Sequence, residues 1–245
     1  MFVTNLNGVY MQLLSTVANA KIEKTNAVTG EDYLYAEMSL MPNHRICGGS
    51  KAAGCMDACL RNAGRGVFPN VRDARQRKSD FWMDNPVAFK ALLVLELEAL
   101  VRKAQKQGKT LRVRLNCLSD ISWELQPCLR NGMAFKGIPQ AFPEIEFYDY
   151  TKLANRLGKT PENYHLTFSY SGVPTYKNQI KVAQTTDANI AVVFHGKELP
   201  VTFMNRKVID GDLHDARIDD PKGVIVGLRA KGTARKDVSG FVVHI

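Results

Sequence analysis

Three of the five cysteines, Cys47, Cys55 and Cys59, lie within thirteen residues of the chain. They follow the pattern Cys-x7-Cys-x3-Cys, and five of the seven residues between the first two are glycine or alanine. Small residues let a backbone wrap closely and offer its N–H groups to thiolate or sulfide sulfurs, which tunes an iron–sulfur centre. We therefore predict a [4Fe–4S] cluster held by three thiolates, with one iron open to a further ligand.

Two other interpretations of these cysteines stay open. His44 could complete a Cys3His zinc site, although structural zinc usually binds two short knuckles and the chain has no Cys-x2-Cys pair. Free cysteines at such spacing can also be ordinary core residues. The other two cysteines are expected to be structural, since alternation places Cys117 on an apolar strand face and Cys128 follows Pro127 in a connection.

A second group of reactive side chains occupies the acidic segment DGDLHD. Asp210 and Asp212 share a face of an extended chain, where they could hold Mg2+ or Mn2+ for a metal-dependent nuclease. The same residues also suit turns and helix caps. Asp149 and Lys152, near the end of a predicted strand, are further catalytic candidates that could bind substrate or form an ion pair.

Basic residues exceed acidic ones, 33 against 24, which gives a formal net charge of +9. Much of the excess follows the cysteines directly, in a stripe that holds one acid, Asp73. Such a stripe favours nucleic acid, a nucleotide or another polyanion as a partner, although it is equally typical of a solvated helix face. Arg61 and Arg65 open the stripe, and the nucleic-acid-binding candidates are Arg72, Arg75, Arg77 and Lys78.

The first half of the chain supplies the elements that must position these residues. We expect helices over residues 8–20, 54–62, 71–81 and 86–107, and extended segments over residues 21–28 and 33–41. The helix that opens at Gly54 would place Cys55 and Cys59, four residues apart, on one face. Pro86 and Gly108 mark the two ends of the long helix.

Short extended runs recur through the rest of the chain, over residues 111–120, 145–152, 164–172, 190–197, 207–215 and 223–232. Helical or irregular links separate them, which is typical of parallel βαβ units. We therefore predict an α/β fold, a complete or incomplete β/α (TIM-like) barrel with the cysteine loop after the first strand. One domain would span residues 1–245, with residues 1–32 as an N-terminal extension.

Alternation along these strands predicts that several have a polar face. Arg112, Arg114 and Asn116 lie opposite Val113 and Leu115. In a barrel wrapped by helices the polar face lines the lumen and would bind a polar ligand, whereas strands at a sheet edge would expose it to water. The substrate-binding candidates are Arg114, Asn116, His165, Ser169, His195, Arg229 and Lys231.

The N-terminus lacks a basic segment followed by an apolar one, and Glu96 and Glu98 interrupt the longest apolar helix. We therefore predict a cytoplasmic protein with no membrane partner. In a reducing compartment, clustered cysteines favour a metal or a reactive site over disulfides. The sequence leaves the oligomeric state open.

Six segments occur in order: SLMPNHRICGGSKAAGCMDACLRNAGRG, VRLNCLSDISWE, FPEIEFYDYTK, NYHLTFSYSG, AVVFHG and VIDGDLHDARIDDPKGVIVGLRAKG. Together they resemble the phage-encoded gene-product-eighty-eight-like family, from about Glu37 onward. The resemblance implies a bacteriophage protein in the host-cell cytoplasm, with a cysteine-rich loop and a fold similar to the barrel of radical S-adenosylmethionine enzymes. Those enzymes carry Cys-x3-Cys-x2-Cys and a Gly-Gly-Glu type segment. Neither is evident here, which argues against S-adenosylmethionine as a cofactor.

Overall fold

The computed structural model describes residues 11–16, 25, 27–30, 32–59, 61 and 63–245. Its centre is one eight-stranded sheet in which every neighbouring pair is parallel except the last, β9 with β8. The strands in spatial order are β1 (Tyr33–Glu37), β2 (Thr110–Arg114), β5 (Glu146–Thr151), β6 (Tyr164–Ser169), β7 (Ile190–Phe194), β10 (Ile225–Arg229), β9 (Arg206–Asp210) and β8 (Thr202–Phe203). The mostly parallel α/β sheet is confirmed.

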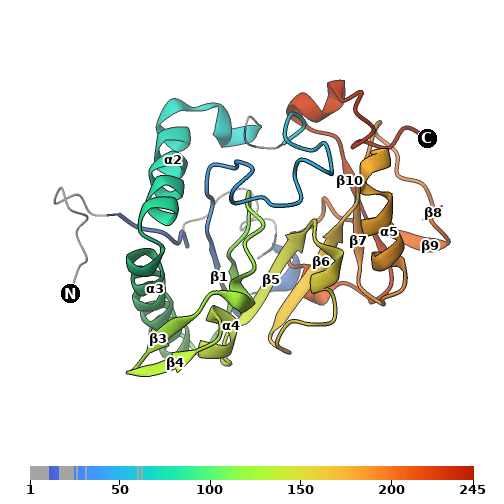
Figure 1. Cartoon of the computed structure of the whole chain (residues 1–245). Coiled ribbons are helices and arrows are strands. Elements are labelled where there is room, and N and C mark those ends of the chain that lie inside the picture. Colours follow the sequence, from blue (N-terminus) through green and yellow to red (C-terminus); the bar gives the residue numbers. More distant parts are fainter. Residues whose placement is uncertain (1–10, 17–24, 26, 31, 60, 62) are drawn as a thin grey trace.

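The sheet is open within the described residues, because β1 and β8 form its two edges and no strand pairing joins them. The closed barrel that the sequence allowed is therefore not formed there. Figure 1 shows the carboxyl ends of β5 and β6 pointing toward the cysteine loop. In a parallel sheet the segments that follow the strands all begin at the same end of the sheet. The candidate site lies at this end, where the carboxyl ends of the strands meet.

The helices lie on one face of the sheet. They are α2 (Pro69–Asp84), α3 (Pro86–Lys106), the short α4 (Ile138–Ala141) and α5 (Lys177–Gln184). The predicted helices over residues 71–81 and 86–107 are thus confirmed. Pro86 begins α3, and the Asn85 side chain caps it by accepting a hydrogen bond from the backbone N of Ala88 (3.0 Å). Phe89 and Leu97 of α3 belong to the same core as Val113 of β2.

The opposite face of β1, β2 and β5 carries polar and aromatic residues, as alternation predicts. The segment over residues 211–220, which includes the 3-10 helix η6 (Arg217–Asp219), covers this face. Arg112 donates two hydrogen bonds to the Asp219 carboxylate (2.6 and 2.9 Å) and one to Glu146 (2.7 Å), and Arg114 pairs with Asp215. The polar face is therefore filled by ion pairs from the chain itself.

Two expectations for the N-terminal part are wrong where the structure describes it. Residues 11–16 are not helical, and Ser15 instead forms an antiparallel bridge with Glu37. Residues 25 and 27–29 are helical rather than extended. The remaining residues of the segments 8–20 and 21–28 lie outside the described part of the chain.

The helix expected over residues 54–62 is also absent from the described residues 54–59. Gly54 has φ +60°, which is a left-handed conformation and does not continue a helix. The backbone carbonyls of Ala52, Ala53 and Asp57 accept hydrogen bonds from hydroxyl groups of distant segments instead of from following N–H groups. Tertiary contacts thus replace the hydrogen bonds that a helix would make.

The strands β3 (Cys128–Arg130) and β4 (Met133–Phe135) form a hairpin that was not predicted from the sequence. Its turn is Asn131-Gly132, both with positive φ, which is the strongest local hairpin signal. Cys128 therefore lies in a strand, not in a connection, and is buried. No helix in the described part of the chain is long and apolar enough to cross a membrane.

Candidate metal centre

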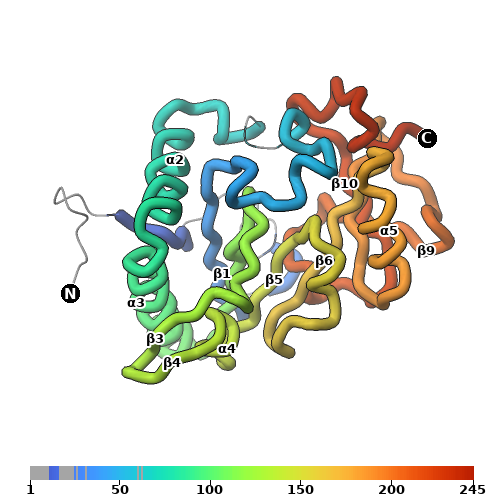
Figure 2. Tube along the Cα trace, in the orientation of Figure 1, coloured from blue at the N-terminus to red at the C-terminus, as the bar shows by residue number. Residues whose placement is uncertain are grey.

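The cysteine loop, residues 43–59, lies across the carboxyl ends of the central strands (Figure 2). The Ile46 carbonyl accepts a hydrogen bond from the backbone N of Asp120 (2.9 Å), beyond β2. The Ala53 carbonyl accepts one from the Ser171 hydroxyl (2.6 Å), beyond β6. The loop is thus tied to two strand ends far apart in the sequence.

The three predicted ligands, Cys47, Cys55 and Cys59, all lie in or at the end of this loop and are half-buried. Burial raises the pKa of each thiol, and it raises the pKa of the Cys47 thiol to about 12. The charges of Asp120, Cys59 and Cys55 raise the pKa of Cys47 further, so the three sulfurs share one neighbourhood. In the absence of a metal, burial keeps these groups as neutral thiols.

Lys152 is the buried cation next to these thiols. Its ammonium donates hydrogen bonds to the carbonyls of Ser169 (3.1 Å) and Tyr170 (3.0 Å) and lies 4.6 Å from the centre of the Phe241 ring. Burial lowers the pKa of Lys152 to about 8, while the charges of Cys55, Asp120 and Cys59 raise it. The side chain therefore places a positive charge under the loop.

Asp120 forms no ion pair with the Lys152 ammonium, because its carboxylate is engaged by other donors. Its carboxylate accepts hydrogen bonds from the backbone N of Lys152 (2.7 Å) and from Arg156 (2.7 Å). Arg156 also binds both oxygens of Glu124 at 2.8 Å. No ion pair joins the Lys152 ammonium to a carboxylate within the described residues.

In this conformation the three thiols are too far apart to bind one metal ion together. Within the described ranges, no group of three His, Cys, Asp or Glu side chains is arranged to hold a metal ion in this conformation. His44, the alternative zinc ligand, is exposed, and its Nδ1 lies 3.1 Å from the Ser50 hydroxyl. The thiols would have to draw closer together to bind a metal.

A second set of groups flanks the loop at the ends of β1 and β2. The Cys117 thiol donates a hydrogen bond to the Glu37 carboxylate (3.6 Å). Burial lowers the pKa of Arg75 on α2, and the charges of Cys117, Glu37 and Cys59 oppose this effect. Cys117 is thus not on the apolar face, because β2 ends at Arg114 and strand alternation stops there.

Asp149 and Asn116 lie together on the helix side of the sheet. The Asp149 carboxylate accepts hydrogen bonds from the Asn116 backbone N (2.7 Å), the Asn116 side chain (3.1 Å) and the Tyr164 hydroxyl (2.8 Å). Burial raises the pKa of Asp149 to about 7, against the lowering effect of Arg114. These contacts join β5, the first residue of β6 and the segment after β2, so in this conformation both side chains connect strands.

The acidic segment after β9 is occupied by basic side chains. Arg229 contacts Asp210 (2.9 Å) and Asp212 (3.2 Å), and Lys231 contacts Asp212 (2.5 Å). Hydrogen bonding to Arg229 lowers the pKa of Asp210. A divalent cation would have to displace both cations, so this geometry favours a structural ion cluster over a nuclease site. The described strands enclose no lumen, and Arg229 and Asp210 instead line an open hollow of about 570 Å3 beside β9.

The other predicted substrate-binding residues are dispersed. Arg114 is buried and paired with Asp215, and His165 is exposed near the amino end of β6. His195, after β7, stacks on His244 with 4.5 Å between ring centres. Ser169 alone reaches the loop region, through its carbonyl contact with Lys152.

The basic stripe divides into two sets on α2. Arg72 and Arg77 are exposed, whereas Arg75 and Lys78 turn inward. The Lys78 ammonium donates a hydrogen bond to the Leu13 carbonyl (2.8 Å), and burial lowers its pKa. Two of the four nucleic-acid-binding candidates are therefore internal contacts.

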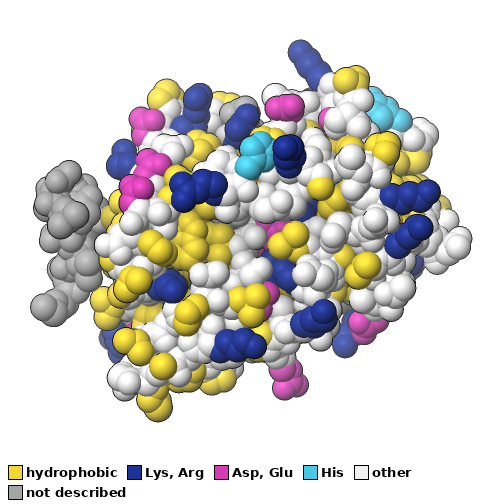
Figure 3. All heavy atoms as spheres, in the orientation of Figure 1, with side chains coloured by type: hydrophobic (Ala, Val, Ile, Leu, Met, Phe, Trp, Pro, Cys, Tyr) yellow, Lys and Arg dark blue, Asp and Glu magenta, His cyan; other side chains and the backbone are white. Residues whose placement is uncertain are grey.

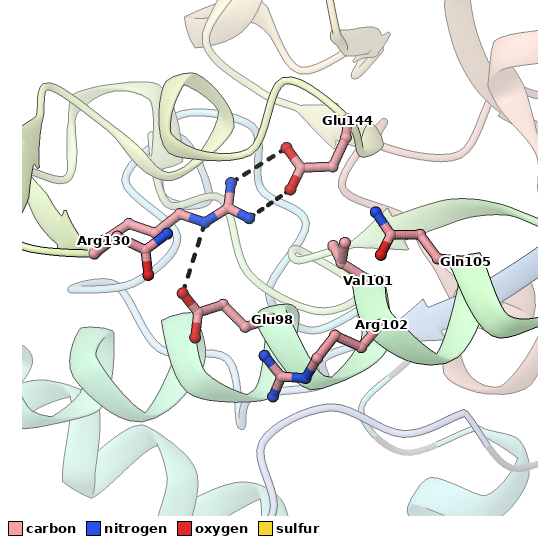
Figure 4. A pocket seen from close by; sticks show the side chains of 7 residues that line it. Glu98, Val101, Arg102, Gln105, Arg130 and Glu144 are labelled. Atoms are coloured by element: carbon pink, nitrogen blue, oxygen red, sulfur yellow. Dashed lines mark hydrogen bonds and ion pairs between the residues drawn. The ribbon is translucent and has the colours of Figure 1, made fainter.

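A hollow of about 240 Å3 lies between α3 and the β3–β4 hairpin (Figure 4). Arg130 lines the hollow and forms ion pairs with Glu144 (2.5 Å) and Glu98 (3.7 Å). Its guanidinium also lies 4.0 Å from the centre of the Phe142 ring. The Arg130 Nε is buried without a hydrogen-bond partner among the described residues, and the hollow is at the hairpin, away from the cysteine loop.

Sequence reasoning did not single out Asp120, Glu124 or Arg156 as parts of the site. Arg156 lies 32 and 36 residues from its two acidic partners along the chain, so no local spacing could link them. Their burial, which requires that the charges be paired, is known only from the structure.

The chain was compared with models of known families, with curated proteins and with solved structures. The family described as Gene product 88 matches residues 12–245. Neither a curated protein nor a solved structure matches the chain. Since the family match covers nearly the whole sequence, the chain belongs to the Gene product 88 family.

Proposed function

We propose that this protein binds a [4Fe–4S] cluster through Cys47, Cys55 and Cys59 at the carboxyl ends of its strands. The fold would then be an incomplete β/α barrel similar to that of radical S-adenosylmethionine enzymes, with the cluster loop after the first strand. One iron would be open to a polar or anionic substrate. The spacing of the cysteines still argues against S-adenosylmethionine itself.

The observation that carries this proposal is the meeting of three half-buried thiols with the buried Lys152 under one loop. An unpaired ammonium in a protein interior is costly unless an anion accompanies it. Cys55 and Cys59 lie near enough to Lys152 to affect its pKa when ionised, and no carboxylate of the described residues forms an ion pair with it. Thiolates on a metal would supply the missing negative charge.

The loop composition supports the same conclusion. Gly48 and Gly49 follow the first cysteine and Gly54 precedes the second, so the backbone can fold tightly around a bound group. Three ligands within thirteen residues can close on a cluster by a local rearrangement of the loop.

Variants of single cysteines test this proposal. Cys55→Ser and Cys59→Ser should lose most of the iron that the wild-type protein takes up during anaerobic reconstitution with iron and sulfide. Cys128→Ser is the matched control, because the Cys128 thiol lies in the hairpin and donates to the Gly137 carbonyl (3.9 Å). Equal iron content in all three variants would contradict the ligand assignment. Stoichiometric zinc in the wild-type protein would show that the site binds zinc instead of a cluster.

A further inference from the structure

Exposed basic residues gather at the carboxyl end of the sheet, after three different strands. The cysteine loop follows β1, the 3-10 helix η5 (Pro174–Tyr176) and α5 follow β6, and the 3-10 helix η7 (Gly232–Lys236) follows β10. We call this surface the basic face. Its exposed cations are Arg45, Lys51, Arg65, Arg72, Lys177, Lys231, Arg235 and Lys236.

Hydrogen bonds join these segments into one surface. The Thr175 hydroxyl of η5 donates to the Ala52 carbonyl (2.7 Å), and the Thr233 hydroxyl of η7 donates to the Asp57 carbonyl (3.1 Å). Figure 1 shows the cysteine loop between η7 and the start of α2 along the upper edge of the molecule. Figure 3 shows dark blue side chains along this upper part, with a few acids among them.

The other end of the sheet has no such excess. Among the residues that directly precede the strands, the exposed cations Lys106, Lys159 and Lys222 are balanced by the exposed acids Asp32, Glu144, Glu162 and Asp187. On the basic face, Asp57 and Asp73 are the exposed acids within the loop and the start of α2. Exposed cations thus outnumber exposed acids at the carboxyl ends of the strands but not at their amino ends.

The cations of the basic face are available for a partner. Within the described residues, Arg45, Lys51, Arg65, Arg72 and Lys236 form no ion pair. The arginine guanidinium presents a fork of donors that fits phosphate oxygens. A surface of unpaired, exposed arginine and lysine matches the electrostatic requirements of a phosphate backbone.

We propose that the basic face binds nucleic acid, through phosphate contacts that cross the cysteine loop from α2 to η7. This inference goes beyond the proposed metal site and stands without it, because the cations belong to the polypeptide. It also replaces the contiguous stripe Arg72, Arg75, Arg77 and Lys78 by a surface drawn from several segments. The contacts would be to the backbone, so the binding would tolerate many base sequences.

Binding of a fluorescent single-stranded DNA oligonucleotide to metal-free protein, measured over a range of salt concentrations, tests the inference. Two double variants reverse charges on the basic face. One combines Arg65→Glu with Arg72→Glu, and the other combines Arg235→Glu with Lys236→Glu. Each should weaken binding and lower the slope of log affinity against log salt by roughly 1.5, the value for two lost phosphate contacts.

The matched control is Lys159→Glu with Lys222→Glu, which changes the net charge equally at the opposite end of the sheet. It should bind the oligonucleotide like the wild type. No binding at low salt, or equal weakening in all three double variants, would overturn the inference. Because the metal-free protein is used, the absence of a cluster does not affect the result, and binding here does not support the cluster.

Discussion

Gly49 lies directly against Lys152, so close that a Cβ at position 49 would stand 2.4 Å from the Cβ of Lys152. Real Cβ atoms do not approach one another so closely. The glycine therefore lets the cysteine loop reach the end of β5, where the lysine is buried. This contact couples the composition of the loop to the position of the positive charge beneath it.

Gly49→Ala should destabilise the protein by about 1–3 kcal/mol, because the loop or β5 must shift to admit the methyl group. Gly48→Ala is the matched control, since nothing lies within 4 Å of a Cβ at that position. Urea unfolding of the two variants measures the difference. Equal free energies of unfolding would show that the loop accommodates a methyl group at position 49 without loss of stability.

Arg156→Met should cost about 3–5 kcal/mol, because it leaves the carboxylates of Asp120 and Glu124 buried without their cation. Chemical denaturation measures this loss. Adding Asp120→Asn and Glu124→Gln to the same variant should restore part of the stability, since the uncompensated charges are then gone. A small loss in Arg156→Met, no greater than in a variant of the exposed Arg102, would mean that the network contributes little.

The stability of the protein should depend on Asp149. Burial raises the pKa of this carboxyl to about 7, above the value of about 3.9 for an unfolded chain, so the native state holds the proton more tightly. The free energy of unfolding contributed by this group is therefore full below about pH 4 and is lost as the pH rises through about 7.

Asp149→Asn removes that titration, so the free energy of unfolding of the variant should fall less than that of the wild type between about pH 5 and about pH 8. Asp220, whose pKa burial raises to about 6, titrates in both proteins and cancels in the comparison. Parallel pH profiles for the two proteins would rule out the raised pKa of Asp149.

The elements with strong periodicity could be predicted from the sequence. Pro86 and Gly108 gave α3 to within one residue of its end. The extended segment predicted over residues 33–41 and the six later ones all appear as strands, each shorter than expected, whereas the described residues of 21–28 do not. The conformation of the cysteine segment could not be predicted, because its carbonyls bond to hydroxyls that lie more than 100 residues away. Helical spacing of Cys55 and Cys59 was thus the wrong reason for expecting them to be neighbours.

Other errors came from extending a local rule past the end of its element. The face of Asn116 follows from alternation only if β2 continues, and β2 ends at Arg114. The inward turn of Arg75 and Lys78 depends on the packing of α2 over the cysteine loop and the N-terminal segment. Composition could show that these residues are charged but not which partner each one meets.

Lys152→Met tests whether the buried ammonium acts on the proposed cluster. Methionine keeps an apolar stem of similar length and removes the charge, so reduction of a nearby cluster should become harder and its midpoint potential should fall. Redox titration followed by electron paramagnetic resonance measures the potential. The control is Lys177→Met at the exposed start of α5. An unchanged potential in a cluster-loaded Lys152→Met protein would remove the lysine from this role.

The central claim is tested most directly by the iron and acid-labile sulfide content of the wild-type protein, purified without oxygen. A [4Fe–4S] cluster predicts about four of each per chain, with a brown colour that is lost on exposure to air. A colourless protein that holds stoichiometric zinc, or that takes up no iron after reconstitution, would contradict the account.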